Sequence, residues 1–534
     1  MFKPVVLLIL DGWGIAPAGP GNAVSLAKIP NFDSFWTAYP HAQLLASGEA
    51  VGLPPGEVGN SETGHLNLGA GQIVYQDLPR INMAIADGRF FQNKALKEAA
   101  QHALKNDSSF QIMGLMGAGG VHSSFDHLLA LIRFAKEANL KKIYLHLFTD
   151  GRDSAPSSAV FLINKLEEEL KHAGIGKIAT LCGRFFAMDR DNRWARTQVA
   201  YEALTSGKGK YATSAFQAIK ESYAQGKSDE FIEPIILDRE GLIKDHDSVI
   251  FFNFRVDRPR QLTKVFVLPD FENIKPKKVF DPYAERYGLH VFEAPGGKET
   301  FVRKTVLKNL FFVTMTEYEK GLPVQVVFPP VSVGLPLARI LSESNLRQLH
   351  IAESEKYPHV TIFFDGGREQ PFPGEDWTEI PSPHVPTYDQ KPDMSAYELT
   401  AEVIRRLESN IYDFILINYA NSDMVGHTGN LQAGIKACEC VDECLGKIVN
   451  TVTNLRGVCL ITSDHGNVEE MIDPITGEID TKHSRNPVPF ILVSQHEYIL
   501  KITSRGILAD VAPTILNLFK IGKSELLTGK SLII

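Results

Sequence analysis

Short β-rich apolar runs that end in polar residues recur along this chain, and they constrain its fold more than any other feature. VVLLIL ends at Asp11, FILINYANS ends at Asp423, and VCLITS ends at Asp464. Stretches with a helical period, such as residues 396–409, separate these runs. Strands that alternate with helices are typical of a doubly wound sheet. The sequence therefore predicts an α/β fold, in which VTIFF from Val360 forms a further strand.

The chain is long enough for more than one domain, with 534 residues of which 44% are hydrophobic. A second series of strand-like runs, FQIMGLM, KIYLHLF, KIATLC and SVIFF, occupies the middle of the sequence. Prolines interrupt the pattern near residues 75–79 and 326–331, where we expect domain boundaries. We predict two α/β domains: one formed by residues 1–76 and 330–534, and a second, residues 77–329, inserted into it.

The charge and the cysteines limit the partners and the compartment. The net charge of -8 disfavours nucleic acid and anionic membranes as partners. No apolar segment has the length of a membrane helix, and the apolar run in MFKPVVLLILDG is too short for a signal peptide. The five cysteines lack disulfide-like spacing, which fits a reducing cytoplasm. Nothing in the pattern demands more than a monomer that acts on a small molecule.

Candidate metal ligands follow the strand-like runs. Because ligands bind beyond the carboxyl ends of parallel strands, Asp11, Asp423 and Asp464 are expected at one edge of the sheet. His427 lies four residues after Asp423, and the remaining candidates are His465 and His483. Asp11 alone would suit a turn, and His427 alone would suit the surface. Together the six residues are enough for two divalent ions, and the mixture of carboxylates and imidazoles favours Mn²⁺ or Zn²⁺ over Mg²⁺.

Ser61 stands in EVGNSETGHLNLGAG, a stretch of small and polar residues at 57–71. A hydroxyl bound to metal is far more acidic than a free one, so Ser61 could attack phosphorus as an alkoxide. The small neighbours would let a phosphoryl group approach closely. The alternative is that Ser61 caps the helix that follows, and both roles are compatible.

An arginine-rich set follows the strand-like runs of the middle region. Arg suits two-point binding of phosphate and carboxylate, although a solvated surface would explain any one of these residues alone. Asp153, beside Arg152, is a candidate for proton transfer, with a salt bridge to a neighbouring Arg as the alternative. His122 lies at another strand-to-helix loop of this region, and Lys356 could supply a cation from the side of the other domain. The arginines are Arg152, Arg184, Arg190, Arg193, Arg255, Arg258 and Arg260.

Motifs spread over the whole chain resemble those of the 2,3-bisphosphoglycerate-independent phosphoglycerate mutase family. They include LILDGWG, GNSETGHLNLGAGQIVYQDLPRIN, TDGRD, GRFFAMDRD, NFRVDRPRQ, AESEKYPHVTIFFDGG, NYANSDMVGHTG, TSDHGN and HSRNPVP. The resemblance implies a metal domain of the alkaline phosphatase superfamily that is interrupted by a substrate-binding domain. It also implies a cytoplasmic isomerase of glycolysis and gluconeogenesis that interconverts 3-phosphoglycerate and 2-phosphoglycerate.

The resemblance also assigns roles to residues. It implies that Ser61 carries the phosphoryl group, that Asp153 exchanges protons with the glycerate hydroxyls, and that 2,3-bisphosphoglycerate is not needed. Two Mn²⁺ ions are implied, with Mg²⁺, Zn²⁺ or Co²⁺ as alternatives. One metal site would contain Asp11, Ser61, Asp464 and His465, and the other Asp423, His427 and His483. The implied substrate contacts are His122, Arg152, Asp153, Arg184, Arg190, Arg255, Arg258 and Lys356.

The sequence departs from the family pattern in three places. Thr63 replaces a small aliphatic residue, Ser484-Arg485 follows His483, and residues 280–309 make a longer connection that we expect to be a surface excursion. Two other functions compete: a phosphatase on the same metal domain, and a protein that binds metal without catalysis. The arginine-bearing insertion argues against the first, and the complete set of ligands and nucleophile argues against the second.

Overall fold

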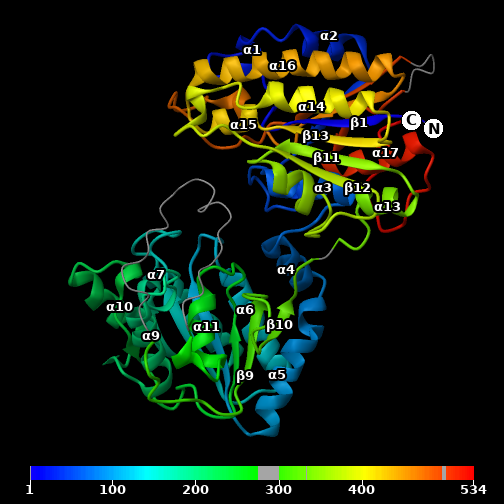
Figure 1. The fold of residues 1–534 in the computed structure, drawn as a ribbon. Helices are drawn as coiled ribbons and strands as arrows, with labels where there is room; N and C mark the ends of the chain where they lie inside the picture. The colour runs from blue at the N-terminus through cyan, green and yellow to red at the C-terminus, as the bar shows by residue number, and fades with distance from the viewer. Residues whose placement is uncertain (1, 275–299, 332, 496–500) are drawn as a thin grey trace. The chain divides into compact units, whose positions relative to one another are not determined.

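The computed structural model describes residues 2–274, 300–331, 333–495 and 501–534. The chain forms two compact units, shown in Figure 1. Unit 1 comprises Met1–Gln76 and Val331–Ile534, and unit 2 comprises Asp77–Pro330. Most of the expected excursion at 280–309 lies outside the described residues. The predicted class, two α/β domains with one interrupted by the other, is confirmed.

The sheet of unit 1 has eight strands among the described residues, in the order β12-β11-β13-β1-β14-β15-β2-β16. The strands β12, β11, β13, β1 and β14 are parallel to one another, whereas β15 runs antiparallel to both β14 and β2. Their bounds are β1 Val5–Leu10, β2 His41–Leu45, β11 Gln348–Glu353, β12 Glu375–Ile380, β13 Phe414–Tyr419, β14 Val458–Thr462, β15 Val488–Ser494 and β16 Arg505–Ile507.

Apolar side chains of β1 alternate between two cores, one on each face of this sheet. Val5, Leu7 and Ile9 pack in one core with helices α3 Ser61–Ala70, α13 Leu337–Glu343 and α17 Val511–Phe519. Val6, Leu8 and Leu10 pack in the other with α1 Ala23–Leu26, α2 Pro30–Ala38, α14 Ala396–Glu408 and α16 Leu431–Asn454. Figure 1 shows α14 and α16 on one face and α3 and α13 on the other. A run that is apolar at every position is therefore a strand covered on both faces.

Two local expectations are wrong. The run from Val360 is not a strand but a π-helix, His359–Phe363, and the strand of this region is β11 before it. Val360 and Phe364, four residues apart, are both fully buried, and a short apolar run does not by itself distinguish the two periods. Asn60, not Ser61, caps α3, because the Asn60 side chain accepts a hydrogen bond from the backbone N–H of Thr63.

The sheet of unit 2 also has eight strands among the described residues, in the order β10-β9-β8-β3-β4-β5-β7-β6. Two buried cores cover its faces. The strands are β3 Phe110–Met116, β4 Ile143–Thr149, β5 Lys177–Gly183, β6 Lys210–Tyr211, β7 Ile235–Ile236, β8 Ser248–Phe251, β9 Phe311–Thr316 and β10 Gln325–Phe328. The helices are α4 Asp77–Ala86, α5 Lys94–Lys105, α6 Phe125–Glu137, α7 Ala159–Ala173, α8 Arg184–Ala187, α9 Trp194–Ser206, α10 Ala215–Ala224 and α11 Pro259–Val267.

Strand order brings distant polar segments to the same edge within each unit. In unit 1 the carboxyl ends of β11, β13, β1 and β14 are consecutive, and the antiparallel β15 begins at this edge. In unit 2 the carboxyl ends of β8, β3, β4 and β5 are consecutive. Among the described residues, no helix combines the length and the apolar character that crossing a bilayer requires. All five cysteines are buried and free, and Cys438, Cys440 and Cys444 lie on α16.

Candidate active site

Ser61 occupies the first position of α3 in unit 1, where the helix lies directly against the loop after β14. A Cβ added to Gly64 would stand 2.6 Å from the backbone oxygen of Asp464, so only glycine permits this approach. The side chain of Asn60 accepts from the backbone N–H of Thr63, one of the free donors at the start of the helix. The Ser61 hydroxyl is therefore left to face the ends of the central strands, and the residue is only 7% exposed.

Three side chains surround the Ser61 hydroxyl. It donates to Oδ1 of Asp11 at 3.3 Å, and Nε2 of His465 lies 2.9 Å away. Nζ of Lys356 donates to it at 2.7 Å. Lys356 follows β11, so it comes from the strand next to β13. Lys356 lies among the candidate metal ligands of unit 1. We call these residues together the Ser61 cluster: Asp11, Ser61, Lys356, Asp423, His427, Asp464, His465 and His483.

Lys356 is the central cation of the Ser61 cluster. Its Nζ lies 2.6 Å from Oδ1 of Asp11 and 2.6 Å from Oδ2 of Asp423. Burial alone would lower the pKa of Lys356, but Asp11 and Asp423 raise it above the usual value, so the ammonium is charged. Burial raises the pKa of Asp423, yet Lys356 and His465 outweigh burial and hold that pKa well below its usual range. Burial and Asp464 raise the pKa of Asp11.

The donor set of the Ser61 cluster fits divalent cations. Asp11, Asp423 and Asp464 are 0%, 2% and 0% exposed, and Lys356 alone cannot neutralise three buried carboxylates. Oδ2 of Asp464 is buried and has no hydrogen-bond partner among the described residues. Buried charges in proteins are paired or coordinate metals. A bound cation would neutralise the surplus negative charge and would contact Oδ2 of Asp464, whose near neighbours are the imidazoles of His65 and His465.

Two imidazoles of the cluster, those of His427 and His483, direct their Nε2 atoms toward Asp423. Nδ1 of His427 lies 2.8 Å from the carbonyl of Thr481, and Nδ1 of His483 lies 2.8 Å from the carbonyl of Gly59. Because each Nδ1–H donates to a carbonyl, a neutral ring keeps its lone pair on Nε2. The two Nε2 atoms are 3.0 Å apart, and they lie 3.3 and 3.2 Å from Oδ1 of Asp423. Such converging lone pairs suit a metal ion.

All seven predicted metal-site residues of unit 1 lie in this one cluster. Ligand atoms of Asp423, His465 and His483 converge in one group, which His427 joins through Asp423, and those of Asp11, His65 and Asp464 converge in another, which Ser61 joins through Asp11. His465 lies between them, because its Nε2 is 3.5 Å from Oδ2 of Asp464, 3.6 Å from Oδ1 of Asp11 and 3.9 Å from Oδ1 of Asp423.

Sequence reasoning missed the residues that support this cluster. His65 contacts Asp464, with Nδ1 3.2 Å from Oδ2, and its Nε2 accepts from Nδ2 of Asn418 at 2.9 Å. Asn418 Nδ2 also donates to Oδ2 of Asp11 at 2.7 Å. The spacing of His65 four residues after Ser61, on the same helix face, was the available signal. For Asn418, the one signal in the sequence was a polar residue inside an apolar strand.

Glu469 is a buried carboxylate that joins three ligand-bearing loops. Its Oε2 accepts from the backbone N–H of Gly14 at 3.0 Å and of Asn467 at 2.8 Å. Its Oε1 accepts from the Ser484 hydroxyl and, at 3.0 Å, from Nδ2 of Asn486. These donors lie within three residues of Asp11, His465 and His483 in the sequence. Glu469 therefore fixes the spacing of the loops that carry the candidate ligands.

A second cluster lies in unit 2, at the carboxyl ends of β3, β4 and β5. Arg184 is 2% exposed, donates to Oδ1 of Asp150 at 2.6 Å and pairs with Asp153. Nε2 of His122 lies 3.6 Å from Oδ2 of Asp153. Asp153 therefore forms a salt bridge with a neighbouring arginine, Arg184, which is the alternative given above for this residue. Burial and the nearby Arg184 lower the pKa of His122 to about 4, so its ring is neutral near pH 7.

Asp257, which the sequence did not single out, joins the remaining part of this second cluster. Its carboxylate lies 3.6 Å from His122, 3.4 Å from Arg255 and 2.8 Å from Arg190. Arg258 donates to the carbonyl of Met188 at 3.1 Å, and burial and Arg184 lower its pKa. Several guanidinium groups so close together favour the binding of an anion.

The side chains of three other arginines make their contacts outside this network. The backbone N–H of Arg152 donates to Asp150 at 3.3 Å, while its exposed side chain lies 3.9 Å from Glu230. Arg193 pairs with Asp191, and Arg260 donates to the carbonyl of Tyr318. The structure brings His122, Asp153, Arg184, Arg190 and Arg255 into one network of contacts.

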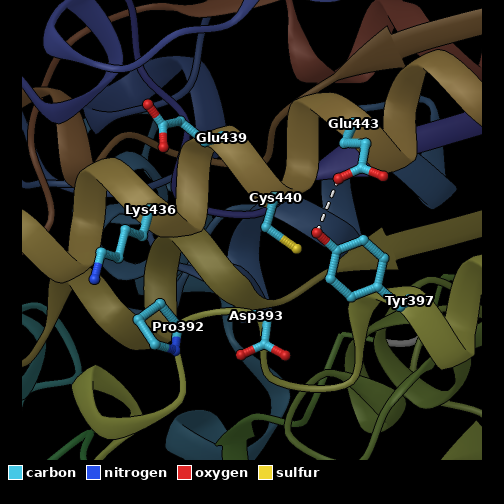
Figure 2. Close-up of a pocket in the computed structure, with 7 residues that line it drawn as sticks. All are labelled: Pro392, Asp393, Tyr397, Lys436, Glu439, Cys440 and Glu443. Atoms are coloured by element: carbon cyan, nitrogen blue, oxygen red, sulfur yellow. Dashed lines mark hydrogen bonds between the residues drawn. The ribbon is translucent and has the colours of Figure 1, made fainter.

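Neither cluster coincides with the hollow shown in Figure 2. That hollow, of about 360 Å³, lies between the start of α14 and the middle of α16. Tyr397 donates to Glu443 across it at 2.9 Å. Its carboxylates and one lysine do not converge on a free polar atom, and it carries no site.

Comparisons with known proteins agree with this chemistry. A model of the Metalloenzyme superfamily matches residues 3–523. The 2,3-bisphosphoglycerate-independent phosphoglycerate mutase of Chloroflexus aggregans is 51% identical over 542 residues, covering 100% of this chain and 99% of the relative. The protein of the same name from Moorella thermoacetica is 49% identical, with 100% and 98% covered. The phosphoglycerate mutase of Leishmania mexicana, crystallised at low cobalt concentration, is 29% identical, with a TM-score of 0.60 and coverage of 100% and 98%.

These relatives match the chain over nearly its whole length, and identity near one half is far above what the fold alone would give. The metal-ligand chemistry of the Ser61 cluster agrees with the superfamily model. The chain therefore belongs to the 2,3-bisphosphoglycerate-independent phosphoglycerate mutase family, within the metalloenzyme superfamily.

Proposed function

We propose that the protein interconverts 3-phosphoglycerate and 2-phosphoglycerate through a phosphoserine at Ser61, without 2,3-bisphosphoglycerate. The observation that carries this proposal is the setting of the Ser61 hydroxyl, which lies within 3.3 Å of Asp11, His465 and Lys356. The names of the relatives, which are about half identical, supply the substrate class. The enzyme would work as a monomer in the cytoplasm, and five buried free cysteines support a reducing compartment.

In the first half of the proposed reaction, Ser61 acts as an alkoxide. Its Oγ forms a bond to phosphorus while the bond from phosphorus to the glycerate oxygen breaks, and that oxygen takes a proton from Asp153. Lys356, with Nζ 2.7 Å from Oγ, would stabilise the negative charge on the serine oxygen and on the phosphoryl group. His122, Arg152, Arg184, Arg190, Arg255 and Arg258 would retain the glycerate.

In the second half, the Asp153 carboxylate takes the proton of the other glycerate hydroxyl. The oxygen of that hydroxyl bonds to phosphorus, the bond to Ser61 breaks, and Ser61 is an alkoxide again. Arg184 pairs with Asp153 and holds its carboxyl group in place. Protons and bonds balance over the two halves, so no further reactant is needed.

The residues that fit the two metal sites are those named above. Asp11, Ser61, Asp464 and His465 would hold one ion, and Asp423, His427 and His483 the other. Bound Mn²⁺, or Mg²⁺, Zn²⁺ or Co²⁺ in its place, would supply positive charge that makes the Ser61 hydroxyl acidic and neutralises phosphoryl oxygens.

The test is to incubate the purified protein with 3-phosphoglycerate and Mn²⁺ and to quantify the products by ³¹P NMR. We expect 2-phosphoglycerate without added 2,3-bisphosphoglycerate, and a phosphorylated Ser61 in quenched samples by mass spectrometry. Inorganic phosphate without 2-phosphoglycerate would instead identify a hydrolase.

A serine variant separates the role of the nucleophile from the fold. Ser61→Ala should lose more than 1,000-fold in rate, on the order of what removing an acting nucleophile costs. The matched control is Ser25→Ala, an exposed serine of unit 1 on α1. A Ser61→Ala protein as active as the control would refute the phosphoserine route.

A further inference from the structure

A second polar cluster is buried in unit 1 and shares no residue with the Ser61 cluster. It contains His350 in β11, Asp365 just after the π-helix, and Glu375 at the start of β12. These side chains are 0%, 1% and 5% exposed. Because β11 and β12 are parallel, with Gln348 opposite Glu375, the first residue of β12 lies beside the strand that carries His350.

Four potential ligand atoms converge in this cluster. Nδ1 of His350 lies 3.0 Å from Oε1 of Glu375, 3.8 Å from Oδ1 of Asp365 and 2.8 Å from the carbonyl oxygen of Val360. Zinc binds nitrogen and oxygen at about 2.0–2.2 Å in a tetrahedron, which places the ligand atoms roughly 3.3 Å apart. The observed separations lie on both sides of that value. Calcium needs six to eight oxygens at longer range, so it does not fit.

His350 is the one basic side chain that pairs with the two carboxylates among the described residues. Nε2 of His350 is buried without a hydrogen-bond partner, beside the rings of Phe364 and Phe414. Within the described ranges, no lysine or arginine forms an ion pair with Asp365 or Glu375. The nearby Arg368 opposes the raised pKa of Asp365 only in part.

Protonation of Asp365 is the competing explanation. Burial and the neighbouring Glu375 raise the pKa of Asp365 well above its usual range, so without a cation this carboxyl would be neutral. However, both of its oxygens are buried and have no hydrogen-bond partner within the described residues. Protonated Asp365 could donate to Glu375, which would remove one negative charge but would leave the other buried oxygen of Asp365 without a partner. A cation would satisfy the charge and the oxygens together.

We propose that His350, Asp365 and Glu375, with the carbonyl of Val360, form a structural site for a divalent cation of the zinc class. Bonds around Glu375 already orient it, because Nε1 of Trp377 donates to Oε1 at 2.6 Å and the backbone N–H of Phe372 donates to Oε2 at 2.7 Å. With four protein ligands and complete burial, the site has no open position for a substrate. The cation would tie the segment between the π-helix and β12 to β11.

The experiment counts bound zinc in the full chain. Apoprotein prepared with a chelator is dialysed against Zn²⁺ alone, and the bound metal is measured by atomic emission. We expect Asp365→Asn and His350→Gln each to bind one equivalent of zinc fewer than the wild type. Asn is the neutral counterpart of a protonated Asp, so an Asp365→Asn protein with the wild-type zinc content would overturn the proposal.

A control and a second measurement keep the result decisive. Asp442→Asn changes another buried carboxylate of unit 1, which binds the amides of Asn31 and Phe32 instead of a cluster, and it should keep the full zinc content. If the variants of His350 and Asp365 fail to fold, a zinc-soaked wild-type crystal decides. An anomalous peak among the three side chains supports the site, and peaks at the Ser61 cluster alone refute it.

Discussion

Replacing Glu469 by Gln tests how the Ser61 cluster is held together. Each carboxylate oxygen of Glu469 accepts two hydrogen bonds, from Gly14 and Asn467 on one side and from Ser484 and Asn486 on the other. Whichever way the amide of Gln turns, its NH₂ group faces two donors. Hydrogen bonds to a charged group contribute about 1.5–3 kcal/mol each, so roughly 3–6 kcal/mol of local stabilisation is lost.

The loss of these hydrogen bonds should first weaken the affinity for metal, because the loops that Glu469 connects carry Asp11, His465 and His483. Removing a residue that orients metal ligands typically weakens binding about 10–100-fold. The dissociation constant for Mn²⁺ can be measured from the EPR signal of free Mn²⁺, at a temperature where the variant is fully folded by circular dichroism. At saturating Mn²⁺, kcat should recover toward the wild-type value.

The matched control is Asp442→Asn, a buried carboxylate that also loses hydrogen bonds to backbone amides but contacts none of these loops. We expect its affinity for Mn²⁺ to equal that of the wild type. If Glu469→Gln binds Mn²⁺ as tightly as the wild type, or if both variants are weakened alike, then Glu469 does not position the ligands and the reasoning is wrong.

Three further predictions concern charge, protons and metal. Lys356→Met leaves Asp11, Asp423 and Asp464 without their cation, so the metal-free variant should unfold several degrees lower than the metal-free wild type in calorimetry. Added Mn²⁺ should raise the unfolding temperature of the variant more than that of the wild type. An equal rise in both proteins would contradict this. Burial lowers the pKa of His127 and of His146 to about 3, below the usual 6.5, so the folded state resists their protonation. Their contribution is present above pH 6.5 and is lost as pH falls toward 3, at about 1.4 kcal/mol per pH unit for each. The urea midpoint should drop between pH 7 and 5.5, and the drop should be smaller in His146→Gln; identical drops would exclude His146. Removal of metal by a chelator should abolish mutase activity, Mn²⁺ should restore it, and 2,3-bisphosphoglycerate should have no effect.

The sequence predicted the parts of the site that depend on strand ends. Asp11, Asp423 and Asp464 follow three apolar runs, and parallel strands bring such residues to one edge whatever their order. The position of Lys356 depends on the order itself, because β11 lies next to β13 only in the folded sheet. Its contact with Ser61 therefore could not be read from the sequence, where it was grouped with the arginines.

The residues that the sequence did not reveal are those that serve backbone amides or other side chains. Glu469 and Asp257 lie in loops with no periodic pattern, and their roles exist only when several loops meet. The sequence predicts a strand at the π-helix His359–Phe363, because a run of four or five apolar residues satisfies either period. The cluster of His350, Asp365 and Glu375 requires the pairing of β11 with β12, which no local signal specifies.

Two separate stretches of the sequence form the sheet of unit 1, and this has a consequence for synthesis on the ribosome. The first strand to emerge, β1, pairs with β13 and β14, whose matching residues follow more than 400 positions later. At roughly 5–20 residues per second, this wait lasts about 20–80 s. Unit 2 is continuous, so its own strands are all available within that interval. A nascent chain stalled before β13 should therefore carry a folded middle and a bare VVLLIL strand, which is the segment that a chaperone would bind.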